Sequence, residues 1–418
     1  MDSERFATRT LTDPRIKRVL AAAVDAADPG RLVRDSLRLL PEASGRIYAL
    51  GLGKAAAAMT KALAECIPVT EALTITKHGE SAPGFPGHLM LGGHPVPDER
   101  SLAAGRAALE FASRCQERDL LICLLSGGGS ALAVAPVQGV GLGDLQEITA
   151  SLLACGASIE EINTVRRSLD TVKGGGLAAA AKGRVASLIL SDVLGNPLES
   201  IASGPTAPNP TTAGDALGVL SRYGITAHKA VLNALRSPDR ALSPERVQNY
   251  VIGDVGTAAR AALSQAEKEG CSARIEDLGL RGEARDVGFR MAQVLKRESA
   301  SRPRPFCLIS GGETTVTIRG RGKGGRNQEL ALAAVDALDR ASRVLLVALA
   351  TDGEDGPTDA AGAVVSGDTR RRALELGMNA DAFLSRNDAY AYFSGLGDLL
   401  KPGPTGTNVN DLVLLCGL

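Results

Sequence analysis

Short apolar runs of strand length recur along the chain, and each one stops at a polar or glycine-rich loop that precedes a helical pattern. The runs are uniformly apolar and do not alternate with polar residues, as expected for strands that helices cover on both faces of a sheet. The pattern predicts an α/β protein with largely parallel, doubly wound sheets. The five clearest runs are residues 46–50, 119–125, 184–190, 304–309 and 343–350.

The loops that follow these five runs carry most of the chain's candidate chemistry. In doubly wound sheets, ligands bind outside the carboxyl ends of the strands, and all five polar loops lie at such ends. We therefore expect one large composite site that several loops build together.

A length of 418 residues favours two domains. The segment 237–247 carries two Ser-Pro steps and lacks an apolar period, so we expect domains at 1–240 and 241–418. The tail at 402–412 is a candidate for a second crossing back to the first domain. Because candidate site residues fall in both domains, a hinge at 237–247 would close them on a nucleotide and its acceptor.

The composition narrows the class of partner. Lys and Arg together number 47, as do Asp and Glu, and aromatic residues make up 3% with no Trp, which argues against nucleic acid. No apolar run approaches the roughly 20 residues that span a bilayer, and the first residues lack a signal peptide's apolar segment, so we expect a cytoplasmic protein without a membrane partner. The seven cysteines form no C-x-x-C pair, which indicates reduced thiols. The oligomeric state stays open, with a homodimer as one candidate.

The sequence G-L-G-K at 51–54 ends a predicted strand and opens an alanine-rich helix. Free backbone amides and the positive end of the helix dipole then lie beside Lys54, an arrangement that binds phosphate. Gly51 and Gly53 are the accompanying candidates for cofactor binding. The spacing matches neither a Walker A loop nor a full dinucleotide fingerprint. An ordinary surface lysine at a helix start is the alternative.

Two further glycine-rich loops follow strands, S-G-G-G-S at 126–130 and S-G-G-E at 310–313. Consecutive glycines let a ligand approach the backbone, and the N–H groups that follow form an anion nest. Two tight turns are the alternative interpretation. The candidate cofactor-binding residues are Ser126, Gly127, Gly128, Gly129, Ser130, Gly311, Gly312 and Glu313, together with Lys173 of a K-G-G-G loop.

The segment R-G-K-G-G-R-N-Q-E at 321–329 places three cations on a flexible loop that opens a helix. Its Arg326 could clamp a phosphoryl group or a carboxylate with two parallel hydrogen bonds. A solvated basic loop is the alternative.

Carboxylates also gather at the predicted strand ends. Asp352 and Asp355 belong to the acidic loop T-D-G-E-D-G-P-T-D, and Asp192 directly follows a fully apolar strand. Such oxygen ligands suit Mg²⁺, and Asp192 could alternatively orient an acceptor hydroxyl as a base. Carboxylates, cations and glycine nests together favour a nucleotide with Mg²⁺ and an anionic acceptor.

Seven motifs occur together between residues 46 and 415: GLGKAA, LLSGGGSAL, INTVRRSLDTVKGGGLA, SDVLGNPLESIASGPTAPNPTT, LISGGETTVTIRGRGKGGRNQELAL, ATDGEDGPTDAAGAVV and PGPTGTNVNDL. Jointly they resemble the class II glycerate 2-kinases, which carry a C-terminal MOFRL domain and have often been labelled hydroxypyruvate reductases. The resemblance implies two α/β domains that flank a deep cleft, and transfer of the γ-phosphoryl group of ATP to the 2-hydroxyl of D-glycerate. It also implies that Lys54 and Arg326 are the catalytic pair. Asp254 departs from the Asn or Ser expected at its position.

Two other functions remain as alternatives. An NAD(P)H-dependent hydroxypyruvate reductase should show a G-x-G-x-x-G fingerprint and a histidine acid backed by a carboxylate. Here the G-x-G sequence after a strand runs into Lys54, and no histidine has an obvious partner. A non-catalytic ligand sensor could lose Lys54, Arg326 or the acidic loop, and all three are present.

Overall fold

The computed structural model describes residues 1–77, 86–236 and 244–418, and the chain divides into two compact units. The parallel-sheet unit is Pro29–Ile252, and the mixed-sheet unit joins Met1–Asp28 to Gly253–Leu418. This division differs from the expected boundary after residue 240, because β6 (Val247–Gly253) completes the first sheet and the N-terminal residues belong with the second. Of the predicted hinge at 237–247, residues 237–243 lie outside the described residues.

The parallel-sheet unit is built on six strands in the order β3-β2-β1-β4-β5-β6. The pairs β3–β2, β2–β1, β1–β4 and β4–β5 are all parallel, as their uniformly apolar sequences predict. The strands other than β6 are β1 (Ile47–Leu52), β2 (Glu71–Thr76), β3 (His88–Leu91), β4 (Leu120–Leu125) and β5 (Arg184–Leu190).

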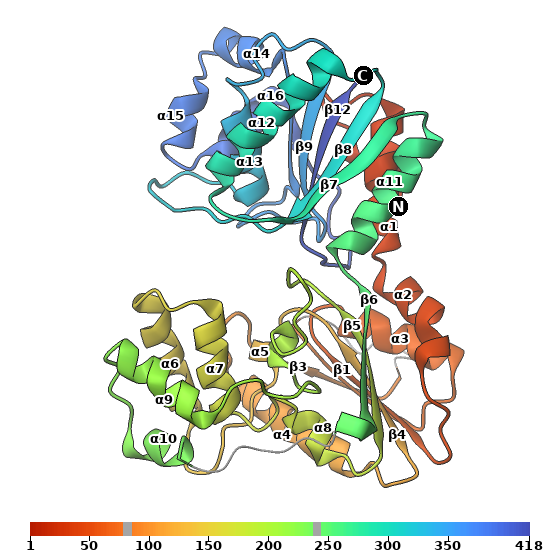
Figure 1. Ribbon diagram of the computed structural model, residues 1–418, viewed down its shortest axis with the longest axis vertical. Coiled ribbons are helices and arrows are strands. Elements are labelled where there is room, and N and C mark those ends of the chain that lie inside the picture. The colour runs from red at the N-terminus through yellow and green to blue at the C-terminus, as the bar shows by residue number, and fades with distance from the viewer. Residues whose placement is uncertain (78–85, 237–243) are drawn as a thin grey trace. The chain divides into compact units, whose positions relative to one another are not determined.

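Helices cover this sheet and also form a separate group beside it (Figure 1). The helices α2 (Pro29–Ser36) and α3 (Ala56–Cys66) pack against each other and the strands, while α4 (Glu99–Ser113) packs with α8 (Gly176–Ala180). The separate group has its own apolar core and consists of α6 (Leu142–Ala154), α7 (Ile159–Leu169), α9 (Ala213–Arg222) and α10 (Lys229–Ala234). Short turns of helix complete the unit: η2 (Leu37–Leu39), α5 (Gly129–Leu132), η3 (Ile201–Ser203) and η4 (Pro244–Arg246).

The second sheet has the order β11-β10-β9-β12-β8-β7 and is mixed. Its β7–β8 pair is parallel, whereas β12 runs antiparallel between β8 and β9. The cause is that no crossover helix precedes β12, so the chain enters the sheet from the edge where β9 ends. This differs from the expected largely parallel sheet and places the C-terminal tail in the mixed-sheet unit. The strands are β7 (Ser272–Leu280), β8 (Phe306–Gly312), β9 (Val344–Ala350), β10 (Gly362–Ser366), β11 (Leu399–Leu400) and β12 (Asp411–Gly417).

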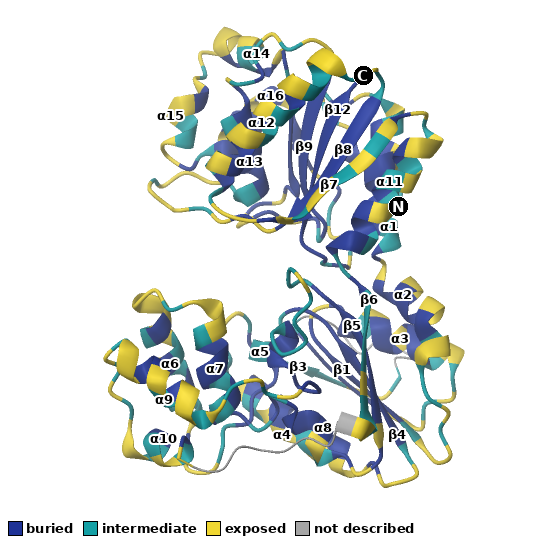
Figure 2. Cartoon of the chain, viewed as in Figure 1, coloured by how far each residue is buried: buried dark blue, intermediate teal, exposed yellow. Residues whose placement is uncertain are grey.

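Helices cover both faces of the mixed sheet, and its central strands are buried (Figure 2). On one face, α1 (Pro14–Ala26) packs on α11 (Val255–Lys268), which contacts β7 and β8. Asp13 starts α1 by accepting a hydrogen bond from the backbone N–H of Arg15. The other face carries α12 (Ala284–Ser301), α13 (Arg326–Ala334) and α16 (Ala389–Leu396), and the remaining elements are η1 (Ser3–Phe6), α14 (Thr369–Glu375) and α15 (Ala380–Leu384).

The structure confirms the α/β class and all five strands predicted from apolar runs. The seven cysteines are free thiols, in agreement with the sequence. Within the described ranges, no helix combines the length and apolarity needed to cross a bilayer.

Candidate active site

The corner between β1 and α3 is fixed by the loop that follows β4. The backbone N–H of Lys54 donates to the carbonyl of Gly127 over 2.9 Å, and the N–H of Ala55 donates to the Ser126 hydroxyl over 3.0 Å. Gly53 has a φ of +132°, and a Cβ there would lie 2.4 Å from the backbone oxygen of Ser126. Only glycine fits, so the two loops that the sequence singled out are one structural element.

The loop 126–130 forms an open nest of backbone donors. Among the described residues, none of the amides of residues 127–130 donates to a protein acceptor. Gly128 takes the left-handed conformation, with φ of +84°, and this turns successive N–H groups toward a common side. Unpaired amides in a partly buried loop require an acceptor, and a phosphate group supplies several oxygens at once.

Lys54 lies beside this nest with an exposed side chain. Its ammonium group forms neither a hydrogen bond nor an ion pair with any described residue. A Cβ built on Gly128 would lie 3.2 Å from Cγ of Lys54 and 3.3 Å from the imidazole of His94. Lys54 and His94 therefore converge on the same glycine. Sequence reasoning missed His94, although its G-G-H-P sequence after β3 was a signal.

Asp192 reaches the nest from the end of β5. A Cβ on Gly127 would lie only 1.8 Å from an Asp192 carboxylate oxygen, so this glycine is required for the close approach. The expected role of Asp192, as a metal ligand or as the base that orients an acceptor hydroxyl, stays a prediction.

A strained turn supports the far side of the nest. Ala202 and Ser203 have φ values of +51° and +61°, a left-handed conformation that costs a non-glycine residue roughly 1–2 kcal/mol. The Ser203 hydroxyl lies 2.8 Å from that of Ser130 and 3.4 Å from Oδ1 of Asn163. Strain held by such contacts is typical of functional sites, and no feature of the sequence revealed it.

Lys173, expected to bind the cofactor, is buried instead. Its ammonium group donates to Asp170 over 2.5 Å and to the carbonyl of Ala133 over 3.4 Å. Burial lowers the pKa of Lys173, and the Asp170 carboxylate opposes this. The contacts indicate that this lysine supports the loop from within.

In the mixed-sheet unit, Arg326 is held by two carboxylates. Its guanidinium group donates to both oxygens of Asp411, over 2.6 and 3.0 Å, and to Glu313 over 2.5 Å. Burial disfavours its charge, but the two carboxylates outweigh this and raise the pKa of Arg326. Burial also raises the pKa of Asp411 against the influence of Arg326. Asp411 lies in the recognised tail motif, but its role as a partner was not anticipated.

Asp355 caps the helix that Arg326 begins. Its two carboxylate oxygens accept hydrogen bonds from the backbone N–H groups of Asn327 and Gln328, over 3.1 and 2.9 Å. Burial raises the pKa of Asp355 to about 6, although the two amides oppose the shift. Because both carboxylate oxygens of Asp355 already accept hydrogen bonds from the helix start, its expected role as a metal ligand is less favoured.

Asp352, the other carboxylate predicted in this loop, accepts a hydrogen bond from the N–H of Glu354 over 3.1 Å.

The three remaining candidate glycines lie within strands, where they allow close packing. A Cβ on Gly51 would lie 2.5 Å from the Thr60 hydroxyl, and one on Gly311 would lie 2.4 Å from Val255. A Cβ on Gly312 would lie 2.3 Å from the carbonyl oxygen of Leu280. These contacts give all three a packing role.

The sequence left the role of Asp254 open, and the structure assigns one. Its carboxylate accepts from the N–H of Thr257 over 2.8 Å, and the Thr257 hydroxyl faces the N–H of Asp254 over 3.3 Å. This is the capping box of α11. Asn, Ser and Asp are all favoured caps, so the departure from the expected residue preserves the helix start.

Within the described ranges the amides of residues 127–130 donate to no protein acceptor, so they could receive the oxygens of a phosphate group. For Mg²⁺, the described part of the chain holds no cluster of three or more acidic, His or Cys side chains suited to a metal. Magnesium bound with a nucleotide commonly takes one or two carboxylates plus phosphate oxygens and water. Asp192 is the carboxylate beside the nest, and its role as a metal ligand stays a prediction.

Two family models match the chain, "Domain of unknown function (DUF4147)" over residues 15–236 and "MOFRL family" over residues 306–411. A D-glycerate 2-kinase of Thermotoga maritima is 42% identical over 404 residues, covering 95% of this chain and 96% of that protein. A glycerate 2-kinase of Pyrococcus horikoshii is 39% identical over 421 residues, covering 95% of each. A crystal structure of a glycerate kinase from Thermotoga maritima matches with a TM-score of 0.90 at 41% identity, covering 96% of this chain and 98% of that one.

Other relatives bear a provisional hydroxypyruvate reductase name. The identities and coverage above agree with the resemblance that the seven motifs carry. The nest, Lys54 and the strand-end carboxylate are groups of the kinds that phosphoryl transfer uses. This chain belongs to the glycerate 2-kinase family, with a DUF4147 region followed by a MOFRL domain.

Proposed function

We propose that this protein transfers the γ-phosphoryl group of ATP to the 2-hydroxyl of D-glycerate, which gives 2-phosphoglycerate and ADP. The observation that carries the proposal is the nest at 127–130 beside Lys54, whose amides and ammonium have no partner among the described residues. Relatives of this chain are named glycerate 2-kinases. A phosphoryl transfer needs fixed positive charge and oriented donors more than covalent chemistry.

In this proposal, the nest amides receive phosphate oxygens, and Lys54 neutralises the charge that spreads over them in the transition state. The donors need no reorganisation, because Gly53 and the Ser126 contacts fix the loop before any ligand binds. ATP supplies the phosphoryl group and Mg²⁺ its charge neutralisation when they are bound.

Asp192 is proposed to hold Mg²⁺ or to orient the acceptor hydroxyl as its base. Both roles use the carboxylate at the end of β5, next to Gly127. Asp192→Asn keeps the shape and removes the charge. A raised Mg²⁺ requirement would indicate the metal role, and loss of kcat at saturating Mg²⁺ would indicate the base. Unchanged metal dependence and kcat would remove Asp192 from the site.

Arg326 is proposed to act in the same reaction, which rests on the family resemblance and on its charge. Its two carboxylate partners fix the guanidinium plane and accept three hydrogen bonds from it. Because Arg has five N–H donors, the others remain for a ligand oxygen. Loss of turnover in Arg326→Ala, measured per folded molecule, tests this role.

The competing reductase function predicts oxidation of NAD(P)H with hydroxypyruvate. A nicotinamide dinucleotide site needs a full glycine fingerprint and a carboxylate at the end of the next strand. The corner at Lys54 lacks the third glycine, and Glu71 lies at the start of β2, not at its end. A coupled assay that follows ADP formation with D-glycerate, run beside NADH and NADPH oxidation with hydroxypyruvate, separates the two functions. Phosphorus NMR of the product then fixes the position of the phosphate. A product phosphorylated only at the 3-hydroxyl would contradict the proposal.

A further inference from the structure

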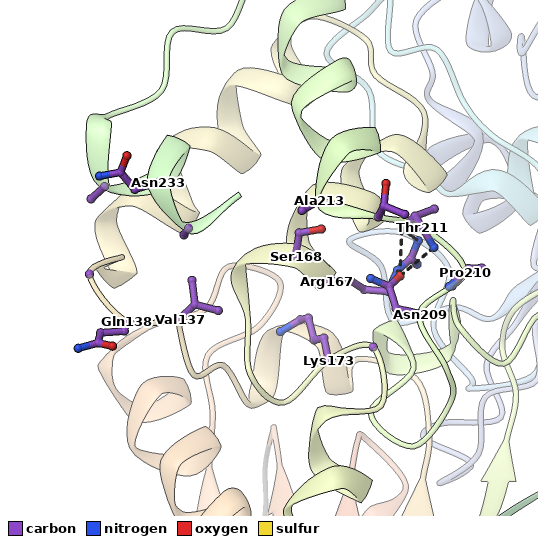
Figure 3. Close-up of a pocket in the computed structure, with 15 residues that line it drawn as sticks. Val137, Gln138, Arg167, Ser168, Lys173, Asn209, Pro210, Thr211, Ala213 and Asn233 are labelled. Atoms are coloured by element: carbon purple, nitrogen blue, oxygen red, sulfur yellow. Dashed lines mark hydrogen bonds between the residues drawn. The ribbon is translucent and has the colours of Figure 1, made fainter. Parts of the chain in front are cut away.

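A cavity of about 590 Å³ opens between the helical group and the loops of the parallel-sheet unit (Figure 3). The segments around it are the loop before α6, the end of α7, the K-G-G-G loop, residues 209–213 and α10. Its volume lies within the range of small-molecule sites in proteins. Neither the nest nor Lys54 lines it, so it is separate from the site described above.

Arg167 gives this cavity a buried positive charge. Its side chain lines the wall, and the residue is 6% exposed. It donates only to neutral acceptors: Oδ1 of Asn209 at 2.8 Å, the Glu199 carbonyl at 3.2 Å and the Thr211 hydroxyl at 3.2 Å, with a longer contact to Thr164. No carboxylate of the described residues forms an ion pair with it. Burial lowers the pKa of Arg167, and the Glu199 carboxylate opposes this shift from beyond ion-pair distance.

A buried guanidinium without a counterion is costly for the folded protein. The four hydrogen bonds satisfy most of its donors, but neutral acceptors do not cancel its charge. Lys173, the other cation of the cavity wall, is already paired with Asp170. The charge of Arg167 therefore remains for an anion that enters the cavity.

The two ends of the cavity differ in chemistry (Figure 3). Arg167, Asn209 and Thr211 form a cluster at one end, while Val137, Gln138 and Asn233 lie toward the other. The second end offers apolar surface and neutral amides. Such a cavity suits a molecule with an anionic group at one end and a neutral polar body at the other.

The wall of the cavity is hydrogen-bonded to the nest. The N–H of Gly174, a lining residue, donates to the carbonyl of Ser203 over 3.1 Å. The Ser203 hydroxyl then contacts the hydroxyl of Ser130 in the nest. Occupancy of the cavity would therefore stiffen the strained turn on which the nest rests.

We propose that this cavity is a binding site for a small organic phosphate, whose phosphate group lies toward Arg167 and whose neutral body lies toward Val137, Gln138 and Asn233. Two sources share this chemistry, the nucleotide of the reaction, whose nucleoside is neutral, and a separate phosphorylated metabolite. The product 2-phosphoglycerate carries a carboxylate besides its phosphate, so it probes whether the second end of the cavity accepts an anionic group. The inference rests on the proposed function only for the choice of probes.

The test is calorimetric titration of the full chain with ADP, 2-phosphoglycerate and inorganic phosphate at low ionic strength. Arg167→Gln should weaken binding of at least one of these by tenfold or more, because it removes the buried charge. Asn233 is exposed at the cavity rim, so it accepts either charge without a folding cost. Asn233→Asp should weaken, and Asn233→Lys should tighten, the same ligand about threefold each. Gln116→Glu and Gln116→Lys, on the loop before β4, are the matched controls and should change nothing.

A response of ADP identifies the nucleotide as the ligand, a response of 2-phosphoglycerate identifies the product, and a response of inorganic phosphate alone identifies another phosphorylated metabolite. The site would be overturned if the two Asn233 variants bound the ligand with equal affinity. It would also be overturned if the two Gln116 variants changed the affinity as much as the two Asn233 variants do. Both criteria apply even where Arg167→Gln fails to fold. Turnover of ATP with D-glycerate is measured separately. Normal turnover without any response defeats this inference alone, whereas a response without turnover defeats the proposed kinase function alone.

Discussion

The two glycine-rich loops at strand ends, 126–130 and 310–313, look alike in sequence and differ in structure. After β4 the chain leaves the sheet, and the amides of the glycines stay unpaired among the described residues. At β8 the strand continues through both glycines, which pair with Leu412 and Asp411 of β12. Pairing with the neighbouring strand β12 thus keeps the backbone of Gly311 and Gly312 from forming a second nest. A glycine-rich loop can therefore offer its amides to an anion only where no neighbouring strand pairs with them.

The two candidate catalytic cations differ in the same way. Lys54 has no partner among the described residues, whereas Arg326 is held by Asp411 and Glu313. We therefore propose that the charge of Lys54 meets a ligand, whereas Arg326 links α13 to β12 and to the loop that follows β8. Substitutions at the two positions should separate these roles.

The largest effect is expected for Arg326→Ala. Removal of the guanidinium leaves Asp411 buried without its partner, which should lower the free energy of unfolding by about 2 kcal/mol, less than for a fully buried pair because Arg326 is partly exposed. The same change should lower kcat/KM by about 10²–10⁴-fold. Urea denaturation and steady-state kinetics measure the two effects separately.

The double variant Arg326→Ala/Asp411→Asn is the control for the structural part. The double variant removes the charge of the buried Asp411 together with its partner. The free energy of unfolding should therefore return toward that of the wild type, while turnover stays low. Recovery of both properties would show that Arg326 serves the fold alone.

Lys54→Ala should lower kcat/KM by about 10²–10⁴-fold without a measurable loss of stability, because the side chain is exposed and unpaired among the described residues. Lys54→Arg should not restore the rate, since a planar fork does not replace a compact ammonium group. Lys61→Ala, at an exposed lysine of α3, the helix that follows Lys54, is the matched control and should retain full activity. Wild-type kinetics for Lys54→Ala would return this lysine to an ordinary surface role.

The sequence predicted the parts of this fold that depend on local pattern. Uniformly apolar runs identified the five central strands, and the loops that follow them hold Lys54, the nest and Asp192. The antiparallel insertion of β12 could not be predicted in this way, because strand direction depends on where the chain enters the sheet. The packing of the N-terminal helix α1 on α11 could not be predicted from local pattern either, because the two helices are far apart in the sequence.

Two of the predicted site residues have contacts that the sequence did not indicate. Lys173 and Asp355 look like exposed ligands in the sequence, but one is paired with Asp170 and the other caps α13. These partners lie 3 and 28 residues away, and no local rule distinguishes a carboxylate that meets a metal from one that meets a helix end. His94 was overlooked because only the fold brings it to Gly128.

Alanine substitutions in the two loops should give opposite results. Gly128→Ala places a side chain in the left-handed region and reorients the nest, so kcat/KM should fall about tenfold with a stability loss of about 1 kcal/mol. Gly311→Ala should instead lower stability by about 1–3 kcal/mol through overpacking against Val255, with kcat/KM per folded molecule nearly unchanged. Thermal denaturation and kinetics on the same preparations check both. Loss of rate in Gly311→Ala would place the second loop in the site after all.

The smallest effect concerns the pH dependence of stability, and it tests the cap on α13. Burial raises the pKa of Asp355 to about 6, whereas in the unfolded chain the group titrates near 3.8. Between about pH 4 and 6 the folded protein therefore holds a proton that the unfolded chain has lost, so this group makes stability fall as pH rises through that window. The slope from one proton is at most about 1.4 kcal/mol per pH unit. Asp355→Asn should remove this contribution and leave that of Asp411 in place, which urea denaturation at a series of pH values would show as a flatter profile between pH 4 and 6. Parallel profiles for the two proteins would mean that the two backbone amides keep Asp355 ionised in the folded state, and that the cap outweighs burial.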